Sequence, residues 1–365
     1  MWVGGSIGLK RYREYQRVGN KWKKNSGWGA SPTLGANPAK FLYAVARTAV
    51  RGHPPGWRGV RSAVFSACAA LSYLERGVHS PTSLSLHSDL QLAKDFVGTG
   101  IKGVIGAAFS LIEAQALGYP WFGHWEDAFG PMEQGPDFLV FRSGEMVLVE
   151  AKGTAQDNPA RASWLKAQWK GQIEPHLSWT GADHGWLIAT CLQRSSVSFL
   201  ERLTASSSTW SPGAPRVPPR VKALWLLRGI GRWLGWPSDR EPYEEDLAAR
   251  ERYMYFVDAR EMASLGDRIR KSPREDGLLL GPDITVQLSQ TAALTAVTFC
   301  KADNAELLFS FAEGRSNAEL PIPQSNARVQ QLGHRVGIFW SDGTGMLVSI
   351  HGRSPQETIA ALAGE

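Results

Sequence analysis

The part of the sequence that most constrains the fold is residues 135–152. It contains two apolar runs, residues 138–141 and residues 146–149, on either side of Ser143 and Gly144. Apolar runs bounded by Gly and Pro are typical of β-strands, and a short connection that contains Gly favours a hairpin. The pattern therefore predicts two antiparallel strands that turn at these two residues.

The turn also fixes which residues of the two strands face each other. With this turn, Asp137 faces Glu150 at the far end of the hairpin. Directly opposed residues of an antiparallel pair have Cβ atoms about 5 Å apart. Lys152 projects to the same face as Glu150, because side chains alternate along a strand. The register therefore predicts two carboxylates and one ammonium group on one side of the hairpin.

These three groups have a chemistry of their own. Two facing carboxylates repel, and the pKa of one of them rises unless a cation lies between them. Hard oxygen ligands suit Mg²⁺, which is usually held by one or two carboxylates and keeps positions for water and substrate phosphate. A lysine beside such an ion orients water or stabilises charge on a phosphate. The alternative is a surface hairpin on which Asp137, Glu150 and Lys152 are solvated edge charges.

At Pro136-Asp137 and Glu150-Ala151-Lys152 the sequence resembles the PD-(D/E)XK nuclease superfamily, also called restriction-endonuclease-like, with twelve residues between the two acids. The resemblance implies an α/β core with a mixed sheet, one or two Mg²⁺ ions and metal-dependent hydrolysis of a phosphodiester. It further implies that Asp137 and Glu150 are metal ligands. The carbonyl of Ala151 would be a further ligand, and Lys152 would lie at the attacking water.

Two predicted helices flank the hairpin. An apolar stripe predicts the first at about residues 100–117. Its Glu113 fits the acid that many members of the superfamily carry on this helix, directed at the metal, and a glutamate on the helix surface is the alternative. The second helix, at about residues 160–177, carries Gln168, which fits the glutamine of the exonuclease-like branch. That branch has a Tyr four residues further on, where this chain has Gln172, so the kind of nuclease stays open.

The neighbouring segments complete the predicted core. Residues 119–134 border the expected site and could contact substrate. They carry Glu126, Asp127 and Glu133, of which the last is close enough in the chain to be a rival ligand. The near-continuous apolar run at residues 184–192 predicts a buried central strand. The resulting order of strand, strand, helix and strand is the one that the resemblance implies.

Positive charge gathers near the N-terminal end. Residues 1–28 hold seven Lys or Arg and one acid, which equals the net charge of +6 of the whole chain. Basic side chains neutralise phosphates and aromatic rings stack on bases, so the five interleaved aromatic residues indicate nucleic-acid binding. A flexible basic arm and a transit peptide are the alternatives. The lysines expected to bind nucleic acid are Lys21, Lys23, Lys24, Lys166 and Lys170.

Composition narrows the class of protein. The chain has 365 residues, 43% of them apolar, which is enough for a substantial core. A run of about 18 apolar residues is missing, so no membrane span is predicted, and the N-terminus lacks a signal-peptide core. Cys68, Cys191 and Cys300 are far apart and read as free thiols in a reducing cytoplasm. We therefore expect a cytoplasmic protein.

Further elements are expected outside the core. Asn37 followed by Pro38 is typical of a helix start, and a second helix is expected at about residues 61–76. Residues 197–203 have helix-like spacing. Residues 206–220 are rich in Ser and Pro and predict a linker.

The C-terminal third begins with a basic, Trp-rich stretch at residues 221–236. Such a stretch lies in a membrane interface or, more often, packs against a neighbouring domain. Vesicle binding with and without this segment separates the two. The strands expected beyond it are at residues 253–258, 284–288, 296–300, 307–311, 336–340 and 346–350.

The fold expected from these features is α/β, with a restriction-endonuclease-like core whose mixed β-sheet is flanked by helices. An N-terminal helical region and a smaller C-terminal α+β domain would accompany it. The expected divisions are a basic aromatic arm (1–36), a helical region (37–95), the nuclease core (96–205), the linker with the Trp-rich segment (206–250) and the C-terminal region (251–365).

The expected function is a nuclease that uses Mg²⁺, or Mn²⁺ in its place, and acts as a DNA endonuclease in defence or DNA processing. The alternative is a module on the same fold that binds nucleic acid or a partner without cutting. Partner proteins or a homodimer are open. The sequence lacks a P-loop, CxxC, GxSxG and HExxH, so ATP-driven motion, a zinc site, an esterase and a His-metal nuclease have no support.

Overall fold

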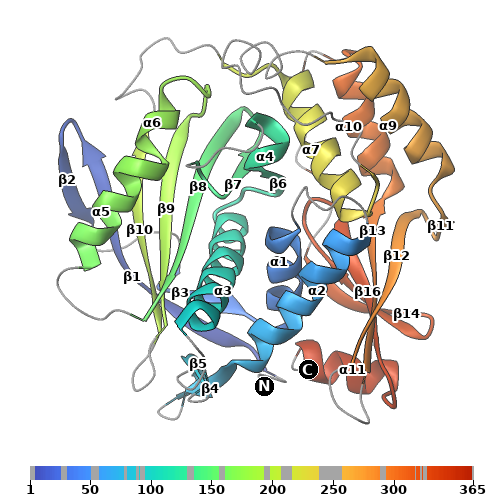
Figure 1. Cartoon of the computed structure of the whole chain (residues 1–365), viewed down its shortest axis with the longest axis horizontal. Helices are drawn as coiled ribbons and strands as arrows, with labels where there is room; N and C mark the ends of the chain where they lie inside the picture. Colours follow the sequence, from blue (N-terminus) through green and yellow to red (C-terminus); the bar gives the residue numbers. More distant parts are fainter. Residues whose placement is uncertain are drawn as a thin grey trace.

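The computed structural model shows two large β-sheets with helices between and around them (Figure 1). A mixed α/β fold with helices flanking a mixed sheet is thereby confirmed. The structure describes residues 5–25, 31–50, 57–77, 80–87, 90, 95–129, 135–155, 161–192, 198–206, 216–237, 257–287, 293–316, 318–320, 323 and 327–363.

The larger sheet has eight strands among these residues, in the order β2-β1-β10-β9-β8-β7-β6, with β3 paired to β1. The β1–β10 and β8–β9 pairs are parallel and the others are antiparallel, so the sheet is mixed. Its strands are β1 (Ile7–Val18), β2 (Lys21–Asn25), β3 (Thr33–Ala36), β6 (Trp121–His124), β7 (Phe138–Arg142), β8 (Glu145–Thr154), β9 (His184–Cys191) and β10 (Phe199–Ser206).

The predicted hairpin is formed by β7 and β8. Arg142 pairs with Glu145 and Phe138 with Val149, which is the register expected from the sequence. Gly144 has a φ of 74°. This left-handed conformation carries no penalty for a residue without Cβ, so the tight turn depends on this glycine.

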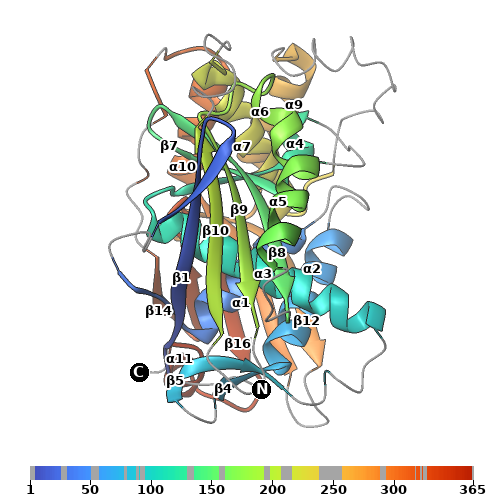
Figure 2. The same cartoon turned by 90° about the vertical axis from the view of Figure 1, so that its left-hand side faces the viewer.

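Side chains of β8 alternate between two buried faces of the sheet. Val147 belongs to the hydrophobic cluster that contains α3 (Asp95–Ala116), and Leu148 belongs to the cluster that contains α5 (Arg161–Gln172). The short α6 (Glu174–Leu177) follows α5 on the same side. The helices α3 and α5 lie on opposite sides of the sheet (Figure 1, Figure 2). We call these sides the α3 face and the α5 face.

The backbone of α3 touches β8 directly. A Cβ atom on Gly153 would lie 1.6 Å from the carbonyl oxygen of Lys102. A Cβ atom on Gly106 would lie 2.4 Å from the backbone nitrogen of Gly153. Real Cβ atoms do not approach other atoms this closely, so glycine at both positions allows the helix to lie against the strand.

The second sheet is formed by the C-terminal part of the chain, in the order β11-β12-β13-β16-β15-β14. Its strands are β11 (Arg274–Glu275), β12 (Leu278–Gln287), β13 (Ala293–Lys301), β14 (Arg328–Leu332), β15 (Arg335–Phe339) and β16 (Thr344–Ile350), and a separate two-stranded sheet is formed by β4 (Leu74–Gly77) and β5 (Ser80–Leu86). Four of the strands expected from the sequence in this region are confirmed.

One expected C-terminal strand is wrong. Residues 307–311 lie in the helix α10 (Ala302–Ala312). Leu308 and Phe311 are buried three residues apart, which is the spacing of one helix face. Residues 253–256 of another expected strand lie outside the described residues, and Asp258 is the N-cap of a helix.

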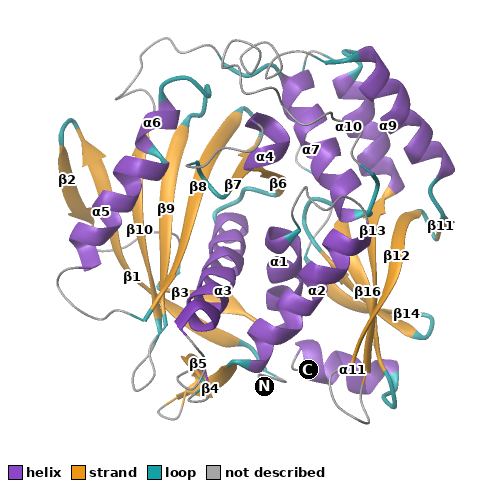
Figure 3. Cartoon of the chain, in the orientation of Figure 1, coloured by secondary structure: helices purple, strands orange, loops and turns teal. Residues whose placement is uncertain are grey.

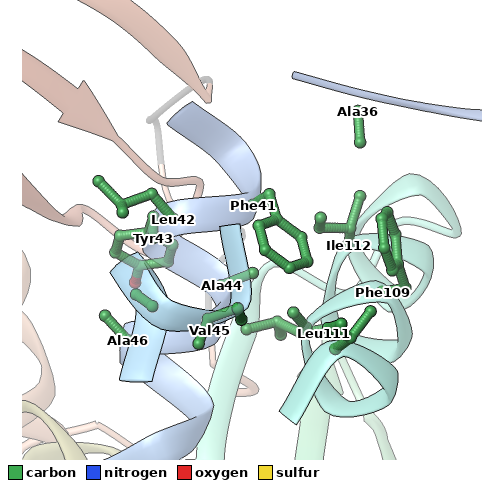
Figure 4. Packing of buried hydrophobic residues seen from close by; sticks show 14 of the residues in the cluster. Ala36, Phe41, Leu42, Tyr43, Ala44, Val45, Ala46, Phe109, Leu111 and Ile112 are labelled. Atoms are coloured by element: carbon green, nitrogen blue, oxygen red, sulfur yellow. The ribbon is translucent and has the colours of Figure 1, made fainter. Parts of the chain in front are cut away.

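Helices fill the space between and beside the two sheets (Figure 3). Phe41 of α1 points toward α3, with its ring centroid 5.2 Å from that of Phe109 (Figure 4). Tyr43 stacks on Trp340 of the C-terminal part, at 4.4 Å. The same helix therefore joins both halves of the molecule. These helices are α1 (Pro38–Ala49), α2 (Trp57–Ser72), α7 (Pro219–Trp233), α9 (Ala259–Lys271), α10 and α11 (Pro355–Ala363).

The Trp-rich segment packs inside the protein. It forms α7, in which Trp225 and Trp233 are fully buried. Packing, rather than a membrane interface, is therefore its environment. In the part of the chain that the structure describes, one helix is long and apolar enough to cross a membrane, at Val97–Ala116 in α3, and 56% of that window is buried. Burial against the β8–β9 side of the sheet makes it a core helix.

Two segments differ from the sequence expectation. Residues 1–36 are not a separate arm, because they supply β1, β2 and β3 of the larger sheet. Residues 199–203, expected as helix, lie in β10, which pairs with strands on both sides. Glu201 and Arg202 are both buried there. Pairing with two neighbours decides the conformation, and it outweighs the local spacing of apolar residues.

Candidate functional site

The far end of the β7–β8 hairpin brings Asp137 to the α5 face. Its backbone N–H donates to the carbonyl of Val149 at 3.0 Å. Its Oδ2 accepts a hydrogen bond from the backbone N–H of Ala151 at 2.7 Å. The residue is exposed. Two contacts to β8 therefore fix this carboxylate while leaving it open to solvent.

Glu150 lies beside Asp137 and is buried, with 2% of its surface exposed. Alternation along β8 directs it to the α5 face. Its Oε1 pairs with the Nζ of Lys152. Its Oε2 is buried and accepts no hydrogen bond within the described structure. A buried acceptor without a donor is costly to the folded state.

The electrostatics of the pair follow from burial. Burial and, after it, the nearby Asp137 carboxylate raise the pKa of Glu150 to about 8 against the opposing effect of the Lys152 ammonium. The raised pKa shows that the charged form of Glu150 is disfavoured here, first by its burial and then by the Asp137 carboxylate. A cation between the two carboxylates would relieve that repulsion. The three groups that the sequence placed together are therefore together.

These residues fit a hard divalent cation. Asp137 and Glu150 supply carboxylate oxygens, one of them exposed and the other holding a buried oxygen free of hydrogen bonds. Mg²⁺ is typically bound by one or two protein carboxylates and completes its shell with water and phosphate. Across the described ranges, no group of three or more His, Cys, Asp or Glu side chains is placed to hold a metal. Glu133, the rival ligand in the sequence, lies outside these ranges.

The short helix α4 (Trp125–Phe129) adds a third carboxylate near the hairpin. It follows β6, whose last residue His124 pairs with Phe138, so α4 begins next to Asp137. The pKa of Glu126 in its first turn is raised, first by loss of surrounding water and then by neighbours that include Asp137. The residue keeps an exposed part. The sequence placed Glu126 only at the border of the site, and its position directly after a strand that pairs with the hairpin is the signal that locates it.

Two arginines of α7 hold α4 in place. Arg232 donates to Asp127 at 2.5 Å. Arg228 donates to the carbonyl of the same residue at 3.0 Å and forms a two-point pair with Glu261 of α9. The helix that carries Glu126 is therefore anchored to the C-terminal part of the chain.

Glu113 does not join the site. It is fully buried on α3, and the guanidinium of Arg11 on β1 donates to both of its carboxylate oxygens at 2.8–3.0 Å. Because α3 covers the face opposite to Glu150, the sheet separates the two carboxylates. The predicted metal-binding role of Glu113 is therefore wrong, and its charge is balanced by an arginine.

The polar residues of α5 divide between its two flanks. Lys166 lies over the ring of Tyr15 on β1, at 6.0 Å. Gln168 is about 160° away from it around the helix, which is the flank toward β8. Lys170 is exposed and is one turn from Lys166. The structure therefore keeps Gln168 on the side of the hairpin site and sets the two lysines apart from it.

The lysines of β2 also divide between two faces. Directly paired residues share a face of the sheet. Lys24 pairs with Tyr15, which packs in the cluster of the α5 face. Lys23 pairs with Gln16, which lines a hollow together with Trp186 of the α3 face. Lys21 follows the alternation of Lys23. Only Lys24 of these three lies on the same face as Glu150.

No family model, no curated protein and no solved structure matches the chain, so the site itself is the basis for proposing a function. The fold and the site together define an α/β protein with a mixed sheet that carries two carboxylates and a lysine at the open end of a central hairpin. The predicted ligand role of the Ala151 carbonyl stays a prediction, since the contact found at this residue is made by its N–H.

Proposed function

We propose that this protein is a metal-dependent nuclease that hydrolyses phosphodiester bonds of DNA. The observation that carries the proposal is the buried carboxyl group of Glu150, which interacts with the neighbouring Asp137 carboxylate and whose Oε2 meets no other donor among the described residues. An acid at this position destabilises the metal-free protein. A role in packing alone would be filled better by an apolar side chain of similar size.

Asp137 and Glu150 are the residues that would hold Mg²⁺, or Mn²⁺ in its place. When bound, the ion would supply Lewis-acid polarisation of a phosphate and a more acidic water. The exposed Asp137 would hold the ion on the solvent side of the site, and the buried Glu150 would hold it on the protein side. The ammonium of Lys152, one-quarter exposed, is positioned to orient water and to balance negative charge on the phosphate. Gln168 on the near flank of α5 is placed to add a hydrogen bond to the same group.

The order of elements supports a restriction-endonuclease-like core. The helix α3 precedes β6, β7 and β8, and α5 and β9 follow. The strand β9 pairs in parallel with β8, and the order of strand, strand, helix and strand is the one that the resemblance implies. The chain departs from the pattern at Glu113, which pairs with Arg11. Glu126 offers the third acid from a different element.

The test is an endpoint assay of the full chain with plasmid, linear duplex and single-stranded DNA and with RNA, in Mg²⁺, Mn²⁺ or EDTA. We expect cleavage that needs the ion and that is lost in Asp137→Asn and in Lys152→Met. The matched control is Glu145→Gln, which neutralises an acid of the same strand on the opposite face and at the turn end of the hairpin. No cleavage by the wild type, or equal cleavage by all variants, refutes the proposal. Metal-dependent binding without cleavage would favour the non-cutting alternative.

A further inference from the structure

A second charged surface lies on the same face of the sheet as the candidate site. It surrounds two half-buried tyrosines, Tyr12 and Tyr15, which pack against the cluster of the α5 face. The guanidinium of Arg13 lies 4.3 Å from the ring of Tyr12 and the Nζ of Lys10 lies 5.5 Å from it. We call this the basic–tyrosine patch, with the members Lys10, Tyr12, Arg13, Tyr15, Lys24 and Lys166.

The patch and the site share one row of the sheet. Tyr15 pairs with Leu203, Leu203 with Leu187, and Leu187 with Glu150. Three strand spacings of about 4.8 Å put Tyr15 about 14 Å from Glu150 along this row. Lys24, one strand further out and opposite Tyr15, is about 19 Å away. The row gives the direct separation of the patch from the buried carboxylate. Its middle residues, Leu203 and Leu187, are fully buried in the cluster that contains α5, so a bound strand would pass around this helix.

The cations of the patch lack acidic partners within the described part of the chain. Arg17 next to them pairs with Glu174 at 3.3 Å, and Glu14 pairs with Arg202 on the opposite face. Lys10, Arg13, Lys24 and Lys166 form no ion pair with a described acid, although the buried Glu201 is the register partner of Arg13. Tyr12 lies against Lys10 and Arg13, and Tyr15 lies against Lys166. Four positive charges on one surface favour a polyanionic partner.

Protection of the sheet edge does not account for the patch. Lysines on an outer strand prevent edge-to-edge association, and this explains Lys21 and Lys23 on β2. Lys10 and Arg13 lie on β1, which is paired on both sides, and Lys166 lies on a helix. These three charges do not lie on a sheet edge, so binding of a ligand explains their presence better than protection against association.

We infer that the basic–tyrosine patch binds the phosphate backbone of the substrate strand at least about four nucleotides from the bond that is cut, because the direct separation of about 14–19 Å corresponds to about four to six nucleotides at about 3.4 Å each and the strand has to pass around α5. The inference rests on the proposed function and names where the substrate extends. The patch contacts backbone rather than bases, because Arg13 already covers the ring of Tyr12. Binding at the patch is independent of nucleotide sequence.

The test measures binding rather than cleavage, so that it stands apart from the test of hydrolysis. Full-length Lys152→Met protein in EDTA is titrated with a single-stranded DNA of about 20 nucleotides, longer than the span from the site to Lys24. Lys24→Ala/Lys166→Ala is compared with Lys21→Ala/Lys23→Ala. Each double variant removes two exposed charges. Lys21 and Lys23 lie on β2 like Lys24, but their side chains are on the opposite face of the sheet.

We expect the first pair to weaken binding about ten-fold at 0.15 M salt and to lower the slope of log affinity against log salt by about 1.4, and the control pair to do neither. Lys10→Ala should reproduce about half of the slope change. Duplex DNA and RNA in the same titration identify the form of the backbone. The inference is overturned if the two double variants lose affinity equally. It is also overturned if the Lys152→Met protein binds neither single-stranded DNA, duplex DNA nor RNA.

Discussion

Replacing Glu150 with Gln should stabilise the metal-free protein at alkaline pH. The carboxyl group is 2% exposed, faces Asp137 and holds an oxygen that no described group contacts as a donor. An amide of the same shape carries no charge, so it escapes the cost of ionisation in this environment. Loss of the ion pair with Lys152 works in the opposite direction, but that lysine keeps a quarter of its side chain in solvent.

The size of the effect follows from the pKa of Glu150. Burial and Asp137 raise it from 4.5 to about 8, and at about 1.4 kcal/mol per pKa unit this corresponds to about 5 kcal/mol. Because the folded-state pKa is above the unfolded one, wild-type stability is complete below pH 4.5 and falls as the pH rises toward 8. The variant should therefore gain on the wild type by about 3 kcal/mol at about pH 7 and by about 5 kcal/mol at about pH 9.

Denaturant unfolding in EDTA at about pH 5, 7 and 9 measures this difference, with Glu145→Gln as the matched control. Glu145 accepts hydrogen bonds from Tyr119 and Arg142 at the turn end of the same strand, so its replacement should lower stability at alkaline pH rather than raise it. Adding Mg²⁺ at alkaline pH should raise the stability of the wild type and leave Glu150→Gln unchanged.

A stability difference that does not change between acid and alkaline pH would refute the reasoning, because the argument depends on the proton that Glu150 binds in the folded state. A variant that is less stable than the wild type at about pH 9 would refute it as well, since the pair with Lys152 would then outweigh the burial of the charge. Either result would remove the main support for a cation site at the hairpin.

Three further predictions concern the surroundings of the site. Arg11→Leu should lower the free energy of unfolding by about 3–5 kcal/mol, because the buried Glu113 carboxylate then lacks its guanidinium partner. The double variant Arg11→Leu/Glu113→Leu should recover most of this loss. A double variant as unstable as Arg11→Leu would contradict the pairing. Glu126→Gln should weaken Mg²⁺ binding about ten-fold in calorimetry and should not lower the free energy of unfolding, because the pKa of Glu126 is raised; unchanged affinity would exclude it from the site. Gly106→Ala should cost roughly 1–3 kcal/mol in denaturant unfolding, because the new Cβ meets the backbone of Gly153, and an unchanged midpoint would refute that contact.

The parts of the site that were predictable from the sequence depend on residues close in the chain. The hairpin register follows from one turn, and the turn follows from Gly144 with its positive φ. The start of α1 is equally local, since the side chain of Asn37 accepts from the N–H of Lys40 at 2.8 Å. In both cases the decisive contact spans only a few residues. The same turn sets the register that brings Asp137 opposite Glu150.

The parts that were not predictable depend on partners far away in the chain. The periodicity of α3 shows that Glu113 borders an apolar stripe, but not that the stripe packs on the face opposite to Glu150. Its partner Arg11 is 102 residues earlier. The strand β10 was missed for the same reason, because its buried Arg202 is paired with Glu14 from β1. A charged residue inside a core strand reads as a helix surface until its partner is known.

The same long-range contacts decide how far the functional unit extends. Asp127, next to Glu126, is held by Arg232 of α7, and α7 packs against α9 and α10 of the C-terminal part. Arg47 of α1 is fully buried and donates a hydrogen bond of 2.9 Å to the carbonyl of Gly229 in α7. Ending the expected core at residue 205 would therefore remove the helix that fixes α4 beside Asp137. The geometry of the candidate site thus depends on both sheets, and the C-terminal part belongs to the support of the site rather than to a separate appendage.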